Sequence, residues 1–516
     1  MSKQSFLYGT LVLIAAGFIT KILGFVYRIA LSRIIGDEGM GLFQMAFPIL
    51  IFAIVITTAG LPVAISKLVS EAEAKNEPHR IRAILIVSFA LIAGSAIIVT
   101  ILILIFAPII ANTLLTDERA MICLIAIAPI IPIIGISTIF RGYFQGKQNM
   151  NPYALSQLIE QTSRIFTVLL LAKYLLPYGI AYAAAGAMLG MVVGEGLGMF
   201  FLLYAFKKDP KRPRFTRKKL PTKQDFVQTF RELIRISIPV TASRMVGSFA
   251  YAIEPIVVAQ SLAIAGIAAA TSTALYGQLE GMAVPLVVFP SFITYALSVS
   301  LVPAISEAAA RNQHRLVEHR LTQAIRLSCI IGAPSAMLIY VLAEPLATLL
   351  YHHPDVADLI RMMAPFGILL YLQGPLASIL QGLDHAHVAM RNSIMGAFLK
   401  TILIFLLGSN PNLGIHGVIL AINCGIVMVT LLHFYSISQL VSVTIYFRSI
   451  LKLFFAASVV GLVAHLIISQ SQVHLITRLI TACIGSLSIY TILLFLFNLI
   501  KREDLLRFPI LAKRLR

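Results

Sequence analysis

Long apolar stretches alternate along the chain with short polar connections. Each apolar stretch holds about 20 residues, which is the length that an α-helix needs to cross the hydrocarbon core of a bilayer. The pattern predicts about fourteen membrane-spanning helices with soft boundaries. Their expected starts are Leu7, Gly41, Arg82, Ala120, Tyr153, Ile180, Thr229, Leu275, Leu321, Val356, Ser393, Ile415, Ile450 and Ile476.

The first apolar stretch differs from a cleavable signal peptide. It runs from Leu11 to Ile35, longer than the apolar region of such signals, and it contains Lys21 and Arg28 where signals carry no charge. We therefore expect this segment to remain as a helix.

Basic connections alternate with connections that are nearly free of Lys and Arg. The basic segments are 67–82, 141–147, 207–235, 311–326, 448–452 and 501–516, and an even number of helices separates them. The connections that are nearly free of Lys and Arg are 36–39, 116–119, 177–179, 352–355 and 410–414. Because short cytoplasmic loops are enriched in Lys and Arg, both termini are expected in the cytoplasm.

The composition agrees with a multi-pass membrane protein. The chain is 59% hydrophobic and only 12% charged, far from the averages of soluble domains. Its net charge of +19 is concentrated in the basic connections, so membrane topology explains it and no nucleic-acid partner is expected. The densest run, 207–223, is also suited to anionic lipid headgroups, at about 1 kcal/mol per basic residue near the surface.

The two halves of the chain resemble one another. Residues 20–24 match 243–247, residues 64–66 match 304–306, and Pro129, Gln145-Gly146 and Arg164 match Pro365, Gln381-Gly382 and Lys400 in the same order. Because both copies start on the cytoplasmic side, the repeat is parallel, a known plan of transporters. We predict a lobe of six helices at 1–206, a basic linker at 207–228, a second lobe of six at 229–440, and two further helices with a basic tail at 441–516.

Basic side chains inside the apolar stretches are the most informative feature. Each would cost about 2.5 to 3.5 kcal/mol at the centre of a helix that faces lipid, so we expect them to face a polar cavity or one another. We interpret them as substrate-binding residues. They are Lys21, Arg28, Arg164, Arg244 and Lys400.

The helices that begin the two halves place their charges on stripes. At 100° per residue the members of the first stripe fall within about 60°, and those of the second within about 80°. The first stripe consists of Gly17, Lys21, Gly24 and Arg28. The second consists of Arg244, Gly247, Tyr251 and Glu254. The glycines either leave room for a bulky headgroup or pack against neighbouring helices.

Four acids in apolar surroundings are candidates for ion coupling or for counter-charges. Glu160 lies four residues before Arg164, so it serves either as an intrahelical partner or as part of a substrate site. Glu195 lies among the glycines of 190–198, a small-residue pattern that favours helix packing, and can balance a buried cation. Glu254 and Glu280 either bind a proton or cation or pair with Arg244.

Several kinds of chemistry lack support. The four cysteines are far apart in apolar surroundings, and Gly146-Lys147-Gln148 lacks the upstream glycine and the Ser or Thr of a Walker loop. His352 and His353, with Asp355 nearby, lack a third firm metal ligand, so a solvated turn is the preferred interpretation. We therefore expect that the protein holds no cofactor or metal and is not an enzyme. As a transporter it would draw its energy from a gradient.

Several short motifs stand out along the chain, at residues 3–7, 9–11, 21–25, 33–36 and 60–67. They resemble the stage V sporulation protein B family, a polysaccharide-transporter branch of the MOP exporter superfamily in endospore-forming bacteria. The resemblance covers essentially the whole chain. It implies a V-shaped, MATE-like bundle of two six-helix lobes plus two helices, related to lipid II flippases of the MurJ type. It also implies a role in spore cortex peptidoglycan synthesis, with cortex enzymes as further partners.

The resemblance also bears on the first helix, where MurJ-type flippases carry essential basic residues. Lys21 matches the first of these within its Leu-Gly-Phe context. Those flippases then carry Arg followed by an acid, whereas here Tyr27 precedes Arg28 and no acid follows. Arg28 is thus shifted by one position from the family's pattern.

The leading hypothesis is a flippase for an undecaprenyl-diphosphate-linked sugar, in particular lipid II, in the cell membrane. A cavity lined by cations suits a diphosphate headgroup. Two alternatives remain open, a cation-coupled drug exporter of the same superfamily and a non-transporting scaffold for cortex enzymes. The drug exporter would favour an acidic cavity, and the scaffold would tolerate neutralisation of the cations.

Overall fold

The computed structural model describes residues 6–58, 60–210, 212–213, 222–442, 447–470 and 474–499, and in these ranges every regular element is a helix. Much of the predicted basic linker, the basic tail and the motif at residues 3–5 lie outside the described residues. The long helices of the N-terminal half are α1 (Phe6–Thr58), α2 (Leu61–Ala74), α3 (Pro78–Ile109), α4 (Ala120–Ile127), α5 (Ile130–Gly146), α6 (Asn151–Leu175), α7 (Ile180–Lys208), α8 (Lys223–Ile264) and α9 (Ala269–Tyr276). The others are α10 (Val284–Val288), α11 (Ser291–Ala310), α12 (His314–Val341), α13 (Ala343–Tyr351), α14 (Val356–Gly382), α15 (Ala386–Gly408), α16 (Gly414–Ser438), α17 (Phe447–Ile468) and α18 (Leu475–Leu496). Two π-helices, η1 (Ile110–Leu114) and η4 (Gly277–Ala283), and a 3-10 helix, η2 (Leu176–Tyr178), connect them.

Twelve segments of the described chain are helices long and apolar enough to cross a membrane. This confirms the prediction of an all-α integral membrane protein. The count of fourteen stays a prediction, because the segment Ala16–Ala74 contains two expected helices and α6 is not among the twelve. The sequence of α6 explains its exclusion, since Glu160, Arg164 and Lys173 lower its apolar character.

The chain divides into two compact units. The first unit comprises residues 1–281 and 408–415, and the second comprises 282–407 and 416–516. Helices α8 and α9 therefore group with the N-terminal helices. The lobe boundaries at 206 and 229 remain predictions.

In the first unit, α1 is divided at Gly36, whose backbone angles (φ 67°, ψ −170°) are open to glycine but strained for other residues. Beyond this break, α1 packs against α9 and η4 with backbones in close approach. A β-carbon at Gly41 would lie 1.9 Å from the Thr273 carbonyl oxygen, and one at Gly277 would lie 2.0 Å from that of Asp37. These glycines are needed because no larger residue fits between the two segments.

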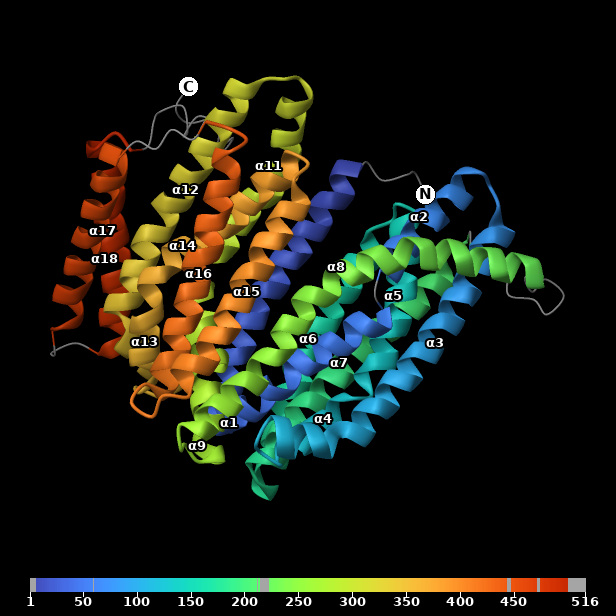
Figure 1. Ribbon diagram of the computed structural model, residues 1–516, viewed down its shortest axis with the longest axis horizontal. Coiled ribbons are helices and arrows are strands. Elements are labelled where there is room, and N and C mark those ends of the chain that lie inside the picture. Colours follow the sequence, from blue (N-terminus) through green and yellow to red (C-terminus); the bar gives the residue numbers. More distant parts are fainter. Residues whose placement is uncertain are drawn as a thin grey trace. The chain divides into compact units, whose positions relative to one another are not determined.

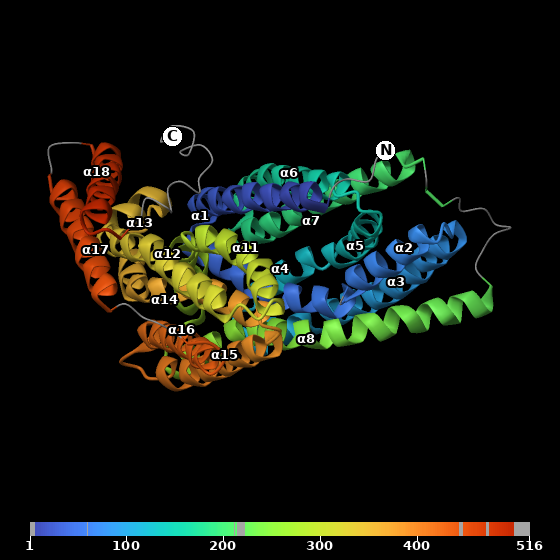
Figure 2. The same ribbon diagram turned by 90° about the horizontal axis from the view of Figure 1, so that it is seen from above.

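The core of the first unit lies between α2, α3, α5 and the start of α8. It contains Ile65, Val69, Ile84, Tyr143 and Leu233, all fully buried or nearly so. Helices α6 and α7 run side by side along the same unit, as both ribbon views show (Figures 1 and 2). This pair carries Glu160, Arg164 and the buried Glu195.

In the second unit a separate core forms between α11, α12, α14 and α16. Helices α17 and α18, in red, pack together, and α17 lies against α12 (Figures 1 and 2). The Tyr490 hydroxyl on α18 donates a hydrogen bond to the Ile330 carbonyl on α12, at 2.8 Å. The two helices predicted outside the repeat are thus attached to the second unit.

The repeated motifs occupy equivalent places in the two units. A β-carbon at Gly146 would lie 2.7 Å from the Ser66 carbonyl oxygen in the first unit. In the second unit a β-carbon at Gly382 would lie 2.7 Å from the Ile305 Cβ, and the Ser306 hydroxyl donates to the Gly382 carbonyl at 3.0 Å. In both units the Gln-Gly motif thus packs its glycine against the Ala-Ile-Ser motif, which supports the internal repeat.

Candidate functional site

Lys21 and Arg28 lie on α1, within the segment Ala16–Ala74, which is long and apolar enough to cross a membrane. They precede the break at Gly36 by 15 and 8 residues, or about 22 and 12 Å along the helix axis. Lys21 is exposed and Arg28 is half-buried. A β-carbon at Gly17 would contact nothing within 4 Å, and one at Gly24 would meet only the Gln161 amide nitrogen at 3.7 Å. The glycines of this stripe therefore leave open space beside the cations instead of forming a tight helix contact.

Helix α8 packs against α1 and brings acids near Arg28. Glu254 is 6% exposed, and the Tyr251 side chain lies within electrostatic range of Arg28, Glu254 and Glu280. Arg244 is exposed and precedes Glu254 by ten residues, about 15 Å along the axis. Arg28, on the neighbouring helix, thus acts on the same tyrosine as Glu254 and Glu280. A pairing of these acids with Arg244 stays a prediction.

Four charged side chains form one cluster between α5, α6 and α7, named here the quartet: Arg141, Glu160, Arg164 and Glu195. One guanidinium nitrogen of Arg141 lies 2.8 Å from Glu160 and 3.0 Å from Glu195. Arg164 forms an ion pair with Glu160 and lies 3.6 Å from Glu195. The expected intrahelical pair of Glu160 and Arg164 is therefore formed, and Glu195 balances buried cations. Whether Arg164 also contacts a substrate stays a prediction.

The glycines of α7 allow this cluster to form. A β-carbon at Gly190 would lie 2.5 Å from the Val168 backbone, one at Gly194 2.8 Å from the Arg164 Cα, and one at Gly198 3.0 Å from the Glu160 Cβ. The preferred interpretation of this pattern as a packing surface is confirmed. The close approach brings Glu195 into reach of both arginines.

Arg141 was assigned from the sequence to a basic cytoplasmic cluster, and its place in the quartet was missed. Its side chain is 19% exposed and also lies over the Tyr153 ring, with its central carbon 5.8 Å from the ring centroid. The sequence feature that could have indicated a buried role for Arg141 is its position within an apolar stretch that continues through Phe144.

In the second unit, Lys400 on α15 lies against α16. A β-carbon at Gly425 would come within 3.0 Å of the Lys400 Cβ. A polar cluster that the sequence analysis did not identify joins the same helices. The Asn392 amide nitrogen lies 3.3 Å from His433 Nδ1 and 2.9 Å from the Ser436 hydroxyl, with Asn392 and His433 each 1% exposed.

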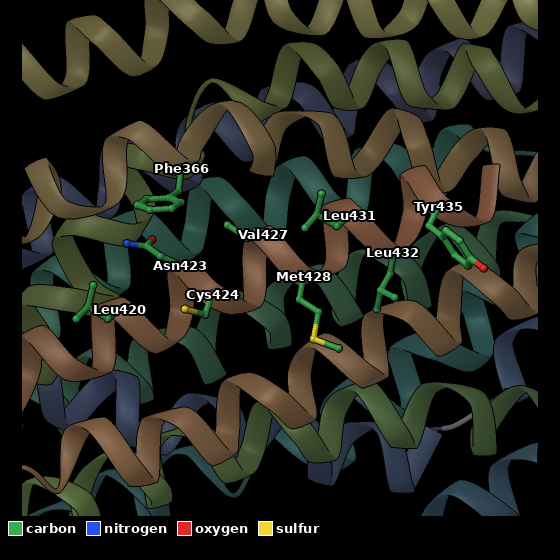
Figure 3. Close-up of a pocket in the computed structure, with 9 residues that line it drawn as sticks. All are labelled: Phe366, Leu420, Asn423, Cys424, Val427, Met428, Leu431, Leu432 and Tyr435. Carbon is green, nitrogen blue, oxygen red and sulfur yellow. The ribbon is translucent and has the colours of Figure 1, made fainter. Parts of the chain in front are cut away.

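An apolar cavity of about 500 Å³ lies along one face of α16 in the second unit (Figure 3). Its lining residues recur every three or four positions on α16, with one contribution from α14. They are Phe366, Leu420, Asn423, Cys424, Val427, Met428, Leu431, Leu432 and Tyr435. Because the lining carries no charged side chain, this cavity does not suit an anionic headgroup.

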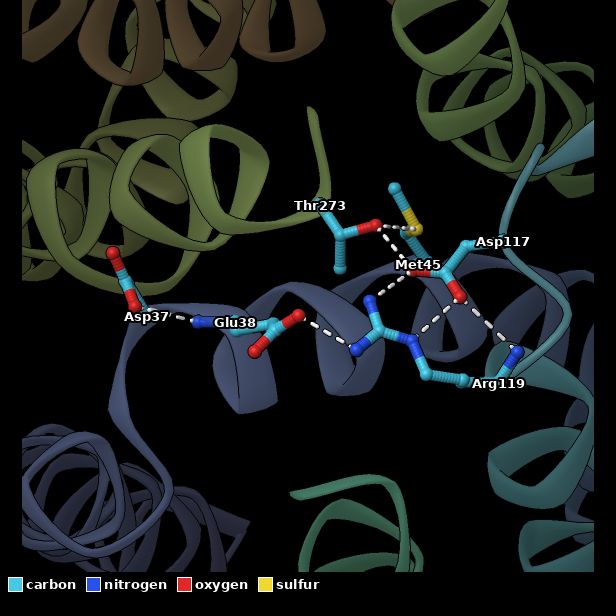
Figure 4. A network of polar contacts seen from close by, with 6 residues as sticks. All are labelled: Asp37, Glu38, Met45, Asp117, Arg119 and Thr273. Carbon is cyan, nitrogen blue, oxygen red and sulfur yellow. Dashed lines mark hydrogen bonds and ion pairs between the residues drawn. The ribbon is translucent and has the colours of Figure 1, made fainter. Parts of the chain in front are cut away.

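A second polar network lies in the first unit, just after the break of α1 at Gly36 (Figure 4). Asp117 accepts hydrogen bonds from the Arg119 guanidinium at 2.7 and 2.9 Å and from the Thr273 hydroxyl at 2.7 Å. Arg119 also donates to Glu38 at 2.6 Å. The network therefore links α1, the connection before α4, and α9.

The network changes the acidity of its members. Burial raises the pKa of the Asp117 carboxyl, but the hydrogen bonds from Arg119 and Thr273 outweigh it and hold that pKa below its usual value. The hydrogen bond to Asp117 raises the pKa of Arg119 above its usual value. Both groups are therefore charged at neutral pH, as a stable ion pair requires.

Within the described ranges, no group of three or more His, Cys, Asp or Glu side chains is arranged to hold a metal ion. Cys123, Cys329, Cys424 and Cys483 are free thiols.

Comparisons with known proteins match this architecture. The family model described as polysaccharide biosynthesis protein matches residues 6–309, and that described as MatE matches residues 280–406. Stage V sporulation protein B of Bacillus subtilis (strain 168) is 45% identical over 99% of this chain and 99% of its own length. The chain belongs to the polysaccharide biosynthesis protein family.

The family lies in the polysaccharide-transporter branch of the MOP exporter superfamily, as the motifs of the sequence had indicated. The lipid II flippase MurJ of Bacillus subtilis (strain 168) is 25% identical over 78% of this chain and 77% of its own length. A solved structure of lipid II flippase MurJ in an inward closed conformation matches with a TM-score of 0.71, at 15% identity, over 94% of this chain and 98% of that one. The expected relation to MATE and MurJ folds is confirmed, and the chain is a multi-pass membrane protein whose named relatives include a lipid II flippase.

Proposed function

We propose that this protein is a flippase that moves an undecaprenyl-diphosphate-linked peptidoglycan precursor, in particular lipid II, across the cell membrane for spore cortex synthesis. The observation that supports the proposal is that Lys21 and Arg28 belong to the apolar segment Ala16–Ala74 and lie beside glycines with open space. Cations in a membrane-spanning segment are costly unless they serve a ligand or a partner. The named functions of the relatives, a sporulation protein and a lipid II flippase, agree with it.

The chemistry of a diphosphate headgroup suits such a site. Its oxygens accept charge-assisted hydrogen bonds, and Lys and Arg side chains offset the loss of its hydration. Outward movement of two negative charges is also favourable by roughly 4 to 5 kcal/mol at 100 mV, inside negative. The membrane potential alone therefore supplies a driving force.

We assign headgroup contact to Lys21, Arg28 and Arg244 in the first unit and to Lys400 in the second. Arg164 takes part only in a state in which its ion pairs with Glu160 and Glu195 are weakened. The polyprenyl chain and the surrounding bilayer are the other partners, and cortex synthesis enzymes are partners in the cell. We place both termini in the cytoplasm, from the distribution of Lys and Arg.

The decisive experiment is a reconstituted translocation assay with the purified full chain in liposomes. We expect fluorescent lipid II to change leaflet faster than in protein-free liposomes, and faster still with an inside-negative potential. A chain that moves neither lipid II nor another polyprenyl-diphosphate sugar, with or without potential and pH gradients, would contradict the proposal. The Lys21→Gln variant is the matched control, since it removes one charge from the proposed site.

A cation-coupled drug exporter is the second candidate, because the MatE model matches residues 280–406. Exporters of cationic compounds favour acidic cavities, whereas cations outnumber acids on the α1 stripe. Efflux of cationic dyes from cells that express this chain distinguishes the two functions. A non-transporting scaffold is the third, and it would retain its function when the cations are neutralised.

A further inference from the structure

We propose that the quartet of Arg141, Glu160, Arg164 and Glu195 is a proton-linked oxyanion site, which takes up a proton when it binds a phosphate group of the headgroup. This inference rests on the proposed function and adds its coupling ion. The argument depends on the charge balance of the quartet, on its unused hydrogen-bond donors and on its exposure.

The quartet is electrically balanced as it stands. Two guanidinium groups face two carboxylates at separations of 3.6 Å or less, so the formal charges cancel when both acids are ionised. An anion gains little from a neutral cluster. Protonation of one carboxylate leaves a net charge of +1 and releases one arginine from part of its pairing. Binding of an anion and binding of a proton therefore favour each other, and by linkage each effect equals the other.

Both arginines retain donors for such an anion. The Nε–H groups of Arg141 and Arg164 are buried and have no hydrogen-bond partner among the described residues. Buried donors without partners are rare in folded proteins and call for an explanation. Phosphate oxygens, like carboxylate oxygens, accept strong charge-assisted hydrogen bonds from a guanidinium group. The two vacant donors are therefore available to an oxyanion ligand.

The exposure of the four side chains places the cations toward the accessible side. The side chains of Arg141 and Arg164 are each 19% exposed, whereas Glu160 is 12% and Glu195 only 3% exposed. A ligand thus meets the arginines first, with the acids behind them. This order suits exchange of a carboxylate for a phosphate on the same guanidinium group.

The groups that act on the quartet are few. Arg141 lies on α5, Glu160 and Arg164 on α6, and Glu195 on α7, and Tyr153 of α6 acts on Arg141. Helices α1 and α4 also pack against α7, and α2 and α3 pack against α5. The ionisable residues among the described side chains of these four helices are Lys21, Tyr27, Arg28, Arg33, Asp37, Glu38, Lys67, Glu71, Glu73, His79, Arg80, Arg82 and Cys123. Because the arginines stay charged throughout the physiological range, the proton goes to a carboxylate of the quartet.

The test measures proton uptake when the purified full chain binds farnesyl diphosphate, with inorganic pyrophosphate as a second probe. Calorimetry in two buffers of different ionisation enthalpy gives the number of protons taken up. We expect the wild type to take up close to one proton more than Glu195→Gln, which imitates the protonated acid. As the pH falls, the affinity of the wild type for farnesyl diphosphate should rise, relative to that of Glu195→Gln, by up to about tenfold per pH unit. The ionisation of the probe itself cancels in this comparison.

Glu160→Gln gives the same comparison if Glu195→Gln does not accumulate. Glu307→Gln is the matched control, since Glu307 pairs with Arg311 at the surface, with side chains 61% and 64% exposed, and should behave as the wild type.

Tighter binding of farnesyl diphosphate than of pyrophosphate identifies a lipid-linked anion, and equal binding identifies a soluble one at the same site. Equal proton uptake in the wild type and both Gln variants would overturn the inference while leaving flipping intact. Absence of any binding by a wild type that still flips lipid II would overturn it as well, whereas loss of flipping alone contradicts the proposed function.

Discussion

Arg164 on α6 lies directly against Gly194 on α7. A β-carbon at residue 194 would come within 2.8 Å of both the Cα and the Cβ of Arg164. The second unit shows the same arrangement, since Lys400 on α15 lies against Gly425 on α16. In each unit an intramembrane cation is thus placed over a glycine of the next long helix, and the internal repeat preserves this relation.

We predict that Gly194→Ala destabilises the protein, because the new methyl group overlaps the Arg164 backbone, which cannot move without disturbing the quartet. The expected cost is about 1–3 kcal/mol, as for overpacking in other cores. Gly196→Ala is the matched control on the same helix, since a β-carbon there meets nothing within 4 Å. It should be neutral or stabilising by up to about 1 kcal/mol. Thermal unfolding in detergent and membrane abundance report the stability of both variants. Equal stabilities would contradict the close packing of Gly194 against Arg164.

The sequence was sufficient for features that depend on local spacing. The apolar stretches predicted the membrane helices, and the four-residue interval between Glu160 and Arg164 predicted their ion pair, because such residues lie on one face of a helix. The small residues of α7 predicted a packing surface for the same reason. The family followed from motifs that stand close together in the chain.

The sequence was insufficient where distant segments meet. Arg141 looks like an ordinary member of a basic cluster until α6 and α7 bring Glu160 and Glu195 beside it. The pairing of Arg119 with Glu38 spans 81 positions and depends on the break at Gly36, which hydropathy does not reveal. Charge patterns therefore identified the cations at membrane depth but not which of them are neutralised.

The predicted orientation can be tested with single cysteines in a cysteine-free background. Cysteines at Lys207 and Gln313 should be shielded from an impermeant thiol reagent in intact cells, whereas those at Asp355 and Asn412 should react. All four positions are largely exposed, so burial does not limit labelling. Permeabilised cells provide the control, because all four should then react. The reverse pattern in intact cells would place both termini outside and overturn the orientation inferred from Lys and Arg.

The Asp117 network predicts a pH dependence of stability. Because the pKa of Asp117 is lower in the folded state than in the unfolded state, the stabilisation is present above the unfolded pKa of about 3.9 and is lost as the pH falls through the lower folded value. Unfolding between about pH 7 and 3 should show this loss. Asp117→Asn should lower the stability at neutral pH by about 1–3 kcal/mol and flatten the acid limb. Glu118→Gln, at the exposed neighbouring position, should keep the wild-type profile, and an unchanged acid limb in Asp117→Asn would refute the assignment.

The cations of α1 and α8 give the prediction that bears most directly on function. Lys21→Ala, Arg28→Ala and Arg244→Ala should each impair spore cortex formation in a Bacillus subtilis strain that lacks its stage V sporulation protein B and expresses this chain instead. The reason is that each variant removes a positive charge from the proposed headgroup site, where it offsets the desolvation of an anion.

Membrane abundance separates this effect from misfolding. Lys21 is exposed beside open space, so its truncation should leave abundance near normal. A cation whose role is to neutralise a buried acid such as Glu254 should instead lower abundance when truncated, and removal of that acid as well should restore it. Lys21→Arg should retain more function than Lys21→Gln if attraction to an anion is decisive, and Arg311→Ala, at an exposed surface pair, should be neutral. Normal cortex in all three alanine variants at normal abundance would reject the cationic site and favour a scaffold, because a scaffold has no need of charge at membrane depth.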